Sequence, residues 1–115
     1  MIFKDGVNLS GLKYVMRQKL IACEEFFKKI GKEFCITEVN TGLHSAGSLH
    51  YYGIAFDVRT RHLTNEEVHE LFLYIQNGPT FFDIVIEKDH IHIEADRRKA
   101  IRQMPIDEFI GFGFI

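Results

Sequence analysis

The fold of this chain is decided between residues 81 and 94, where the sequence reads Phe-Phe-Asp-Ile-Val-Ile-Glu-Lys-Asp-His-Ile-His-Ile-Glu. Two apolar-rich runs, 81–86 and 90–94, flank a short polar segment at 87–89. Two such runs joined by a few polar residues are typical of a β-hairpin. The sequence therefore predicts two antiparallel strands connected by a tight turn.

The second strand of this hairpin carries the pair His90 and His92. Because side chains at positions i and i+2 of a strand point to the same face, both imidazoles can reach one pocket, while Ile91 enters the core on the other side. A polar pair of this kind fits the solvent face of a sheet equally well, so the pair alone indicates no particular chemistry.

Two further strands are predicted before the hairpin. Residues 33–39 alternate between polar and apolar types, become β-branched toward their end, and are followed by Asn-Thr-Gly at 40–42, which breaks the pattern. Residues 53–58, Gly-Ile-Ala-Phe-Asp-Val, have the composition of another strand. A loop that runs as far as about Leu49 is expected between the two.

Two helices are predicted from apolar residues at helical spacing. The first is expected to be capped by Ser10, to carry its apolar positions between 12 and 30, and to end at Gly31. The second begins with the capping-box pattern of Thr64 and Glu67. Runs of strands with helices set to one side favour an α+β domain, built on an antiparallel sheet with the helices packed on one side.

The end of the chain, 96–115, mixes a basic stretch at 97–99 with an apolar ending at 109–115. We expect this ending to form a final core strand; alternatively, it is an exposed apolar patch that docks onto a partner chain. With 115 residues, the chain has room for one core only, so a single domain over residues 1–115 is expected.

Composition and charge exclude several classes of function. The formal net charge is -2, from 14 Lys and Arg against 16 Asp and Glu, which gives no basic excess for a nucleic-acid partner. The chain lacks an apolar stretch of about 18 residues and a secretory signal pattern at its start, so no transmembrane segment and synthesis in the cytoplasm are expected. Cys23 and Cys35 lack C-x-x-C spacing and are expected to be buried core thiols.

Three residues of types suited to metal binding are expected close together. His50 stands at the mouth of the predicted strand 53–58, Asp57 follows seven residues later, and His92 lies on the hairpin. Catalytic zinc sites use three protein ligands from His, Glu, Asp or Cys and leave a fourth position for water. Two imidazoles and one carboxylate satisfy this pattern, so the combination favours zinc over a plain polar sheet face.

The segment 48–57 reads Ser-Leu-His-Tyr-Tyr-Gly-Ile-Ala-Phe-Asp and resembles the S-x-H-x-x-G-x-A-x-D signature of the D-alanyl-D-alanine carboxypeptidase-like zinc peptidases. That family includes the peptidoglycan-cleaving endolysins of phages. All five fixed positions match, and Asp-His-Ile-His at 89–92 matches the second motif, an acidic residue three before a zinc-binding His. Over roughly residues 36 to 94, the chain also resembles the amino-terminal signalling domain of hedgehog proteins, which shares this fold.

The resemblance implies that His50, Asp57 and His92 hold Zn²⁺, in agreement with the ligand argument. A peptide-cleaving zinc enzyme also needs a carboxylate that takes a proton from the metal-bound water and returns it to the leaving amine. Asp89 is the first choice because it stands three residues before the last ligand, and the longer Glu87 is the rival. Either residue would also fit an ordinary role in the hairpin turn.

Three further residues are assigned around this centre. His90 is placed to hydrogen-bond the oxyanion that develops at the attacked carbonyl, or to orient a ligand. His44 matches a His near the metal in the hedgehog pattern. Ser48 is expected to support the site, although a hydroxyl that caps a loop is an equal alternative.

The function implied by the resemblance is zinc-dependent hydrolysis of amide bonds in peptidoglycan peptides, either as a D-Ala-D-Ala carboxypeptidase or as an L-Ala-D-Glu endopeptidase. The expected site of action is the cell wall, the expected origin a phage or bacterium, and the favoured state a monomer. The alternative is a catalytically silent, zinc-containing binding module of the hedgehog type. The segment 38–41, Glu-Val-Asn-Thr, lacks the substrate-binding Arg that the peptidases usually carry there, and too few acidic residues match for a hedgehog-like calcium site, so no calcium is expected.

Overall fold

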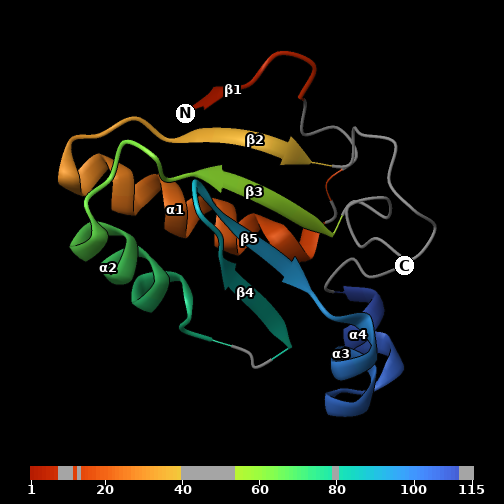
Figure 1. Cartoon of the computed structure of the whole chain (residues 1–115). Coiled ribbons are helices and arrows are strands. Elements are labelled where there is room, and N and C mark those ends of the chain that lie inside the picture. The colour runs from red at the N-terminus through yellow and green to blue at the C-terminus, as the bar shows by residue number, and fades with distance from the viewer. Residues whose placement is uncertain (8–11, 13, 40–53, 79–80, 112–115) are drawn as a thin grey trace.

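Five strands form one sheet in the part of the chain that the structure, a computed structural model, describes: residues 1–7, 12, 14–39, 54–78 and 81–111. The strands are β1 (Ile2–Phe3), β2 (Cys35–Val39), β3 (Ala55–Arg59), β4 (Phe82–Ile86) and β5 (His90–Ala95). Their order in the sheet is β1-β2-β3-β5-β4 (Figure 1). All neighbouring pairs are antiparallel except β1 and β2, which are parallel. The predicted α+β class and mostly antiparallel sheet are confirmed, whereas the short parallel edge strand was not predicted.

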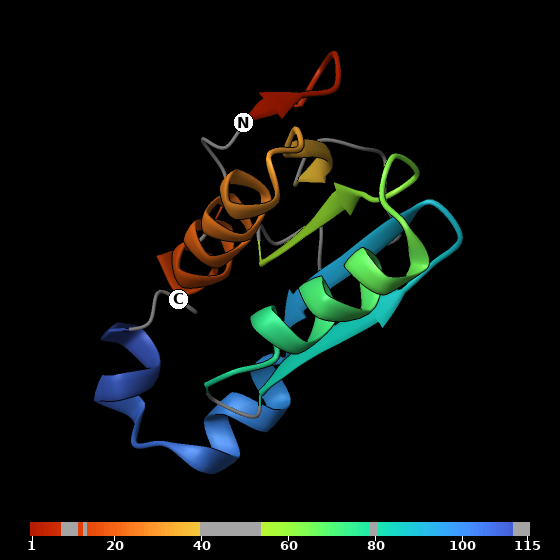
Figure 2. The ribbon, with the colours of Figure 1, turned by 90° about the vertical axis from the view of Figure 1, so that its left-hand side faces the viewer.

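The described residues also form a 3-10 turn and four α-helices. They are η1 (Tyr14–Met16), α1 (Arg17–Ile30), α2 (Asn65–Ile75), α3 (Arg97–Gln103) and α4 (Ile106–Gly111). Helices α1 and α2 pack side by side on one face of the sheet, and α3 and α4 follow the end of β5 (Figures 1 and 2). The other face of β3 and β5 carries no helix among the described residues.

The core lies between the sheet and helices α1 and α2. It takes alternate residues of the central strands and the inner side of each helix, and its fully buried members include Phe27, Phe56, Val58, Leu71, Ile75, Ile91 and Ile93. Burial of each such side chain stabilises the fold by roughly 1.5–3 kcal/mol. Cys23 and Cys35 are buried free thiols, as predicted.

Helix α1 starts later than the sequence predicted and ends where it predicted. The chain enters it through η1, and Ser10, the expected cap, lies outside the described residues. At the other end Gly31 has φ 68°, in the left-handed region that favours glycine. The Gly31 amide donates to the carbonyl of Lys28 at 3.2 Å, which closes the last turn.

Helix α2 begins with the predicted capping box. The Glu67 amide donates to Thr64 Oγ1 at 3.1 Å, and the Thr64 amide donates to Glu67 Oε1 at 2.9 Å. Lys32 Nζ also donates to Glu67 Oε1 at 2.5 Å, which joins the start of α2 to the residue after the α1 cap. This contact links two segments that lie 35 positions apart.

The end of α2 is held by a buried lysine that the sequence did not reveal. Lys19 Nζ donates to the carbonyls of Ile75 at 2.5 Å and Asn77 at 2.6 Å, and it lies 4.7 Å from the ring centroid of Phe82. Burial lowers the pKa of Lys19. The carbonyls left open at a helix end thus find a cation, which is their favoured partner.

The expected final core strand is wrong for the described part of the C-terminal region, which is helical up to residue 111. The Asp96 carboxylate accepts the amides of Arg98 at 2.8 Å and Lys99 at 3.2 Å and thereby caps α3. Phe109 of α4 is buried, whereas Ile106 and Ile110 are more than half exposed. Helix α4 therefore places Phe109 in the core and leaves the two isoleucines at the surface. Residues 112–115 lie outside the described residues.

Over the described residues, no helix is long and apolar enough to cross a membrane.

Candidate metal centre and adjoining cleft

The polar residues of strands β3 and β5 lie on the same face of the sheet. The register pairs Asp57 with His92 and Arg59 with His90. Between these positions Val58 and Ile91 are fully buried and point to the helices. Because side chains alternate along a strand, the four polar residues lie on the opposite, open face, and the predicted facing of the two histidines is confirmed.

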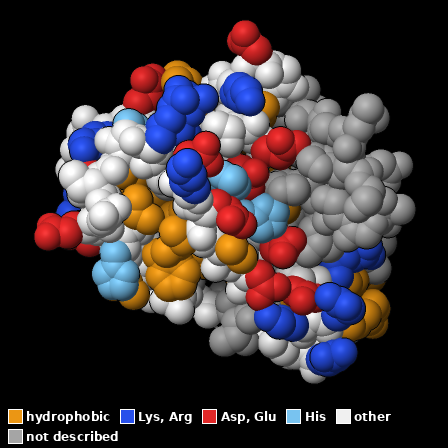
Figure 3. Space-filling view, in the orientation of Figure 1, with side chains coloured by type: hydrophobic (Ala, Val, Ile, Leu, Met, Phe, Trp, Pro, Cys, Tyr) orange, Lys and Arg blue, Asp and Glu red, His pale blue; other side chains and the backbone are white. Residues whose placement is uncertain are grey.

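Figure 3 looks onto this open face. His side chains lie near its middle among Asp and Glu side chains, and Lys and Arg side chains lie toward β1 and β2 and, at the lower right, over the region of α3. The face is therefore divided into an acidic and imidazole-rich centre and a basic border.

His92 is held between two carboxylates. Its Nδ1 lies 2.8 Å from Asp57 Oδ1, and its Nε2 lies 3.2 Å from Glu94 Oε2. All three side chains are largely buried, with exposed fractions of 14% for Asp57, 19% for His92 and 21% for Glu94. Low exposure strengthens these charged contacts relative to pairs in open solvent.

The two carboxylates change the protonation of this imidazole. Burial lowers the pKa of His92, but the hydrogen bonds to Asp57 and Glu94 and the charges of both carboxylates outweigh it and raise the pKa to about 9. At neutral pH the ring therefore holds protons on both nitrogens. Since a ligating imidazole must be neutral, a metal ion bound by His92 has to displace one of these protons.

His90 lies between Asp57 and Asp89, which is in the turn before β5. Its Nδ1 lies 2.8 Å from Asp89 Oδ1, and its Nε2 lies 3.8 Å from Asp57 Oδ2. The hydrogen bond to His90 lowers the pKa of Asp89. Asp57 thus stands between the two histidines.

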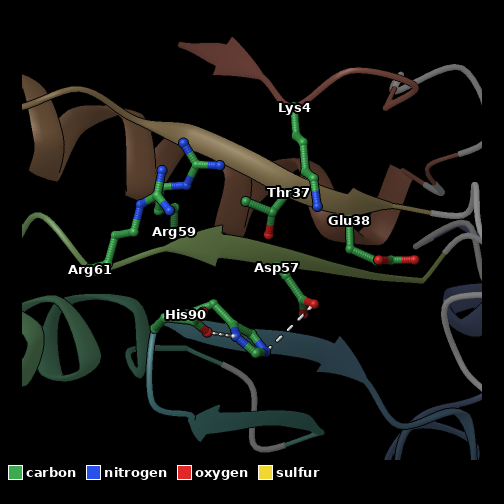
Figure 4. A pocket seen from close by; sticks show the side chains of 8 residues that line it. Lys4, Thr37, Glu38, Asp57, Arg59, Arg61 and His90 are labelled. Carbon is green, nitrogen blue, oxygen red and sulfur yellow. Dashed lines mark hydrogen bonds and ion pairs between the residues drawn. The ribbon is translucent and has the colours of Figure 1, made fainter.

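A cleft with a volume of about 310 Å³ opens beside these residues. It is lined by Lys4, Thr37, Glu38, Asp57, Arg59, Arg61, Asp89 and His90 (Figure 4). Its walls therefore come from the segment after β1, from β2, from β3 and the turn after it, and from the start of β5 with the turn before it. In Figure 4, Arg59 and Arg61 extend toward one end of the cleft, and Asp57 and His90 lie toward the other.

The structure brings four of the predicted site residues together, namely Asp57, Asp89, His90 and His92. Glu87 is exposed in the hairpin turn and is not among the cleft-lining residues. The remaining three, His44, Ser48 and His50, lie outside the described residues.

The described residues supply two of the three donors that the sequence assigns to zinc. No group of three or more His, Cys, Asp or Glu side chains within the described ranges is arranged to hold a metal ion. Asp57 and His92 fit as a pair, because their facing O and N atoms lie 2.8 Å apart. Ligand atoms about 2.0–2.2 Å from a tetrahedral zinc lie roughly 3.3 Å from each other, so the pair needs to open only slightly around the ion.

Three residues of the open face were missed by reasoning from the sequence. Glu94 contacts His92, and Arg59 and Arg61 line the cleft. The signal that could have found two of them is the strand period of two, because Glu94 follows the histidine pair in steps of two and Arg59 follows Asp57 in the same way.

Comparisons of the chain with protein families, with curated proteins and with solved structures gave no match.

Proposed function

We propose that this protein is a zinc-dependent peptidase that hydrolyses amide bonds in peptidoglycan peptides, with Zn²⁺ held by His50, Asp57 and His92. The observation that carries the proposal is the contact of Asp57 Oδ1 with His92 Nδ1 at 2.8 Å on the open face. The resemblance of residues 48–57 to the peptidase signature supports it. We also propose that the α+β fold is of the type shared by hedgehog signalling domains and D-Ala-D-Ala peptidases.

The chemistry needs a Lewis acid and a proton acceptor. When bound, zinc polarises the scissile carbonyl and makes a water molecule a better nucleophile. Asp89 is the proposed acceptor, because it lines the cleft together with Asp57 and His90. Its carboxylate takes one proton from the attacking water and delivers it to the leaving amine nitrogen, so that an acid and an amine leave the site.

Two neighbours keep these groups in place. His90 Nδ1 holds Asp89 Oδ1 at 2.8 Å and so orients the proposed base. Glu94 Oε2 lies 3.2 Å from Nε2 of His92, which orients the ring and leaves Nδ1, the nitrogen beside Asp57, to face the metal. Carboxylates in this position typically raise the basicity of a ligating imidazole.

The first test is the metal content of the purified protein, measured by elemental analysis for the wild type, His50→Ala and His92→Ala. His69→Ala serves as the matched control because His69 lies exposed on α2, away from the site. We expect about one zinc per chain in the wild type and the control and little in the other two. Thermal unfolding of each variant shows whether zinc loss reflects the site or a loss of fold.

Hydrolysis is then measured on the same samples as amino groups released from purified peptidoglycan. Activity that disappears together with zinc supports the peptidase. Stoichiometric zinc without hydrolysis in the wild type would instead favour the alternative, a zinc-containing binding module. A wild-type protein that takes up no zinc on reconstitution contradicts the proposal.

A further inference from the structure

The cleft holds three cationic side chains: Arg59 and Arg61 lie at one end, and Lys4 lies apart from them, near Glu38 (Figure 4). None of them forms an ion pair with another residue in the described part of the chain. Arg59 is also partly buried, where a guanidinium without a carboxylate partner is costly. The cleft also holds three carboxylates, from Glu38, Asp57 and Asp89. Of these, Asp89 contacts His90 and Asp57 contacts His92.

The position of Arg59 relates this end of the cleft to the proposed metal centre. Arg59 lies two residues after Asp57 on β3, on the same face, and pairs with His90 in the register. Two residues of a strand span roughly 6.6 Å. A peptide that lies along β3 with its reacting carbonyl beside Asp57 therefore presents a group about one or two residues away to the guanidinium.

The chemistry of the two arginines selects the ligand. A guanidinium is planar and donates two parallel hydrogen bonds to a carboxylate or a phosphate. Of these two groups, a peptide substrate carries the carboxylate. A cleft volume of about 310 Å³ lies at the lower end of the range for small-ligand pockets and suits one or two residues of a peptide. The ligand class that fits is a short peptide with a free carboxylate.

We propose that Arg59 and Arg61 form a carboxylate-binding subsite that selects peptides with a free carboxylate one or two residues from the cleaved bond. This inference rests on the proposed peptidase function and names its substrate class. It also provides a cationic partner for the substrate from β3 and the turn after it, in a chain whose segment 38–41 carries no Arg. Lys4, on the opposite wall of the cleft, adds positive charge that attracts an anionic ligand.

The test measures binding by NMR titration of the ¹⁵N-labelled protein, so that it does not depend on turnover. The probes are N-acetyl-D-Ala-D-Ala and N-acetyl-L-Ala-D-Glu, each as the free acid and with its carboxylates amidated. The titrations use wild type, Arg59→Gln, Arg59→Lys and Arg61→Gln, with the zinc-loaded and the chelator-treated protein. Arg102→Gln is the matched control, because Arg102 is exposed on α3 and absent from the cleft lining.

We expect at least one acid to bind wild type about tenfold or more tightly than its amide, which is the effect of one charged hydrogen-bonded pair. Arg59→Gln removes this preference, and Arg61→Gln reduces it. Arg59→Lys keeps part of it, because lysine retains the charge but cannot donate two parallel hydrogen bonds. Arg102→Gln leaves the preference unchanged. The Arg59 Nε–H signal shifts on addition of the acid only.

Three results would overturn the subsite: no acid is preferred over its amide, Arg59→Gln weakens acid and amide equally, or the control loses the preference as well. The acid preference in a protein that neither holds zinc nor hydrolyses peptides would keep the subsite and reject the peptidase. Hydrolysis without any acid preference would reject the subsite and keep the peptidase.

Discussion

The two faces of strands β3 and β5 are built from the same backbone and are held together in different ways. On the covered face, Val58, Ile91 and Ile93 are fully buried against α1 and α2. On the open face, the side chains are joined by charged contacts, such as those of His92 with Asp57 at 2.8 Å and with Glu94 at 3.2 Å. The covered face therefore carries the stability of the sheet, and the open face is free to carry chemistry.

The largest expected effect belongs to the open face. Asp89→Asn removes the proposed proton acceptor and is expected to lower kcat about 10²- to 10⁴-fold, the usual contribution of a general base. Because the Asp89 side chain is 66% exposed, the unfolding temperature should hardly change. Steady-state hydrolysis of a peptidoglycan peptide and a thermal melt measure the two quantities.

Glu87→Gln is the matched control for this variant, since Glu87 lies in the same turn and is not among the residues that line the cleft. Its kcat is expected to stay close to that of the wild type. If Glu87→Gln instead causes the large loss, the proton acceptor is Glu87. If neither variant loses activity, the assignment of the base to this turn is wrong.

The next largest effect belongs to the covered face. Ile93→Ala, one residue along β5 from His92, removes a fully buried side chain and is expected to lower the free energy of unfolding by about 2–5 kcal/mol. Urea unfolding measures this quantity. At temperatures where the variant remains folded, zinc binding should be retained, since the side chain points away from the metal centre. Loss of zinc from the folded variant would show that the two faces are not independent.

Glu94→Gln, the neighbouring position on the open face, tests the opposite outcome. A carboxylate that orients a ligating imidazole typically contributes about 10- to 100-fold to metal affinity, so zinc affinity should fall by that factor. Competition with a zinc chelator measures the affinity. If the zinc affinity of Glu94→Gln is unchanged, Glu94 does not orient His92 for zinc and contacts the imidazole only in its protonated, metal-free form.

The smallest effect concerns pH and lies at the α2 cap on the covered side. Hydrogen bonds from Lys32 and from the Thr64 amide lower the pKa of Glu67 below its ordinary value of 4.5. A carboxyl group with a lowered folded-state pKa stabilises the fold above its unfolded pKa, and this contribution is lost as pH falls through the folded value. Between about pH 6 and pH 3, the unfolding temperature of the wild type should therefore fall slightly more than that of Glu67→Gln. Parallel curves would mean that the cap adds no pH-dependent stability.

Elements with local signals were predicted well from the sequence. The capping box of Thr64 and Glu67, the stop of α1 at Gly31 and the hairpin turn at 87–89 each depend on residues a few positions apart. The apolar ending that starts at Phe109 was mispredicted as a strand over its described part, because its run of apolar residues was taken for a strand, whereas residues up to 111 belong to α4. The edge strand β1 has only two residues and no sequence signal of its own, since its pairing depends on β2.

The candidate site divides in the same way. The residue types and their alternation were enough to predict that His90 and His92 share a face and that Ile91 is buried, because strand geometry is local. The contacts of Asp57 with His92 and of Lys32 with Glu67 join residues 35 positions apart in the sequence. The cleft of Arg59 and Arg61 draws on four separate segments of the chain. Such contacts depend on the register between strands, which is set when the apolar faces of β3 and β5 are buried together against the helices. The sequence therefore determined the chemical groups available and the contacts between neighbours such as Asp89 and His90, whereas the contacts between distant residues were decided by packing.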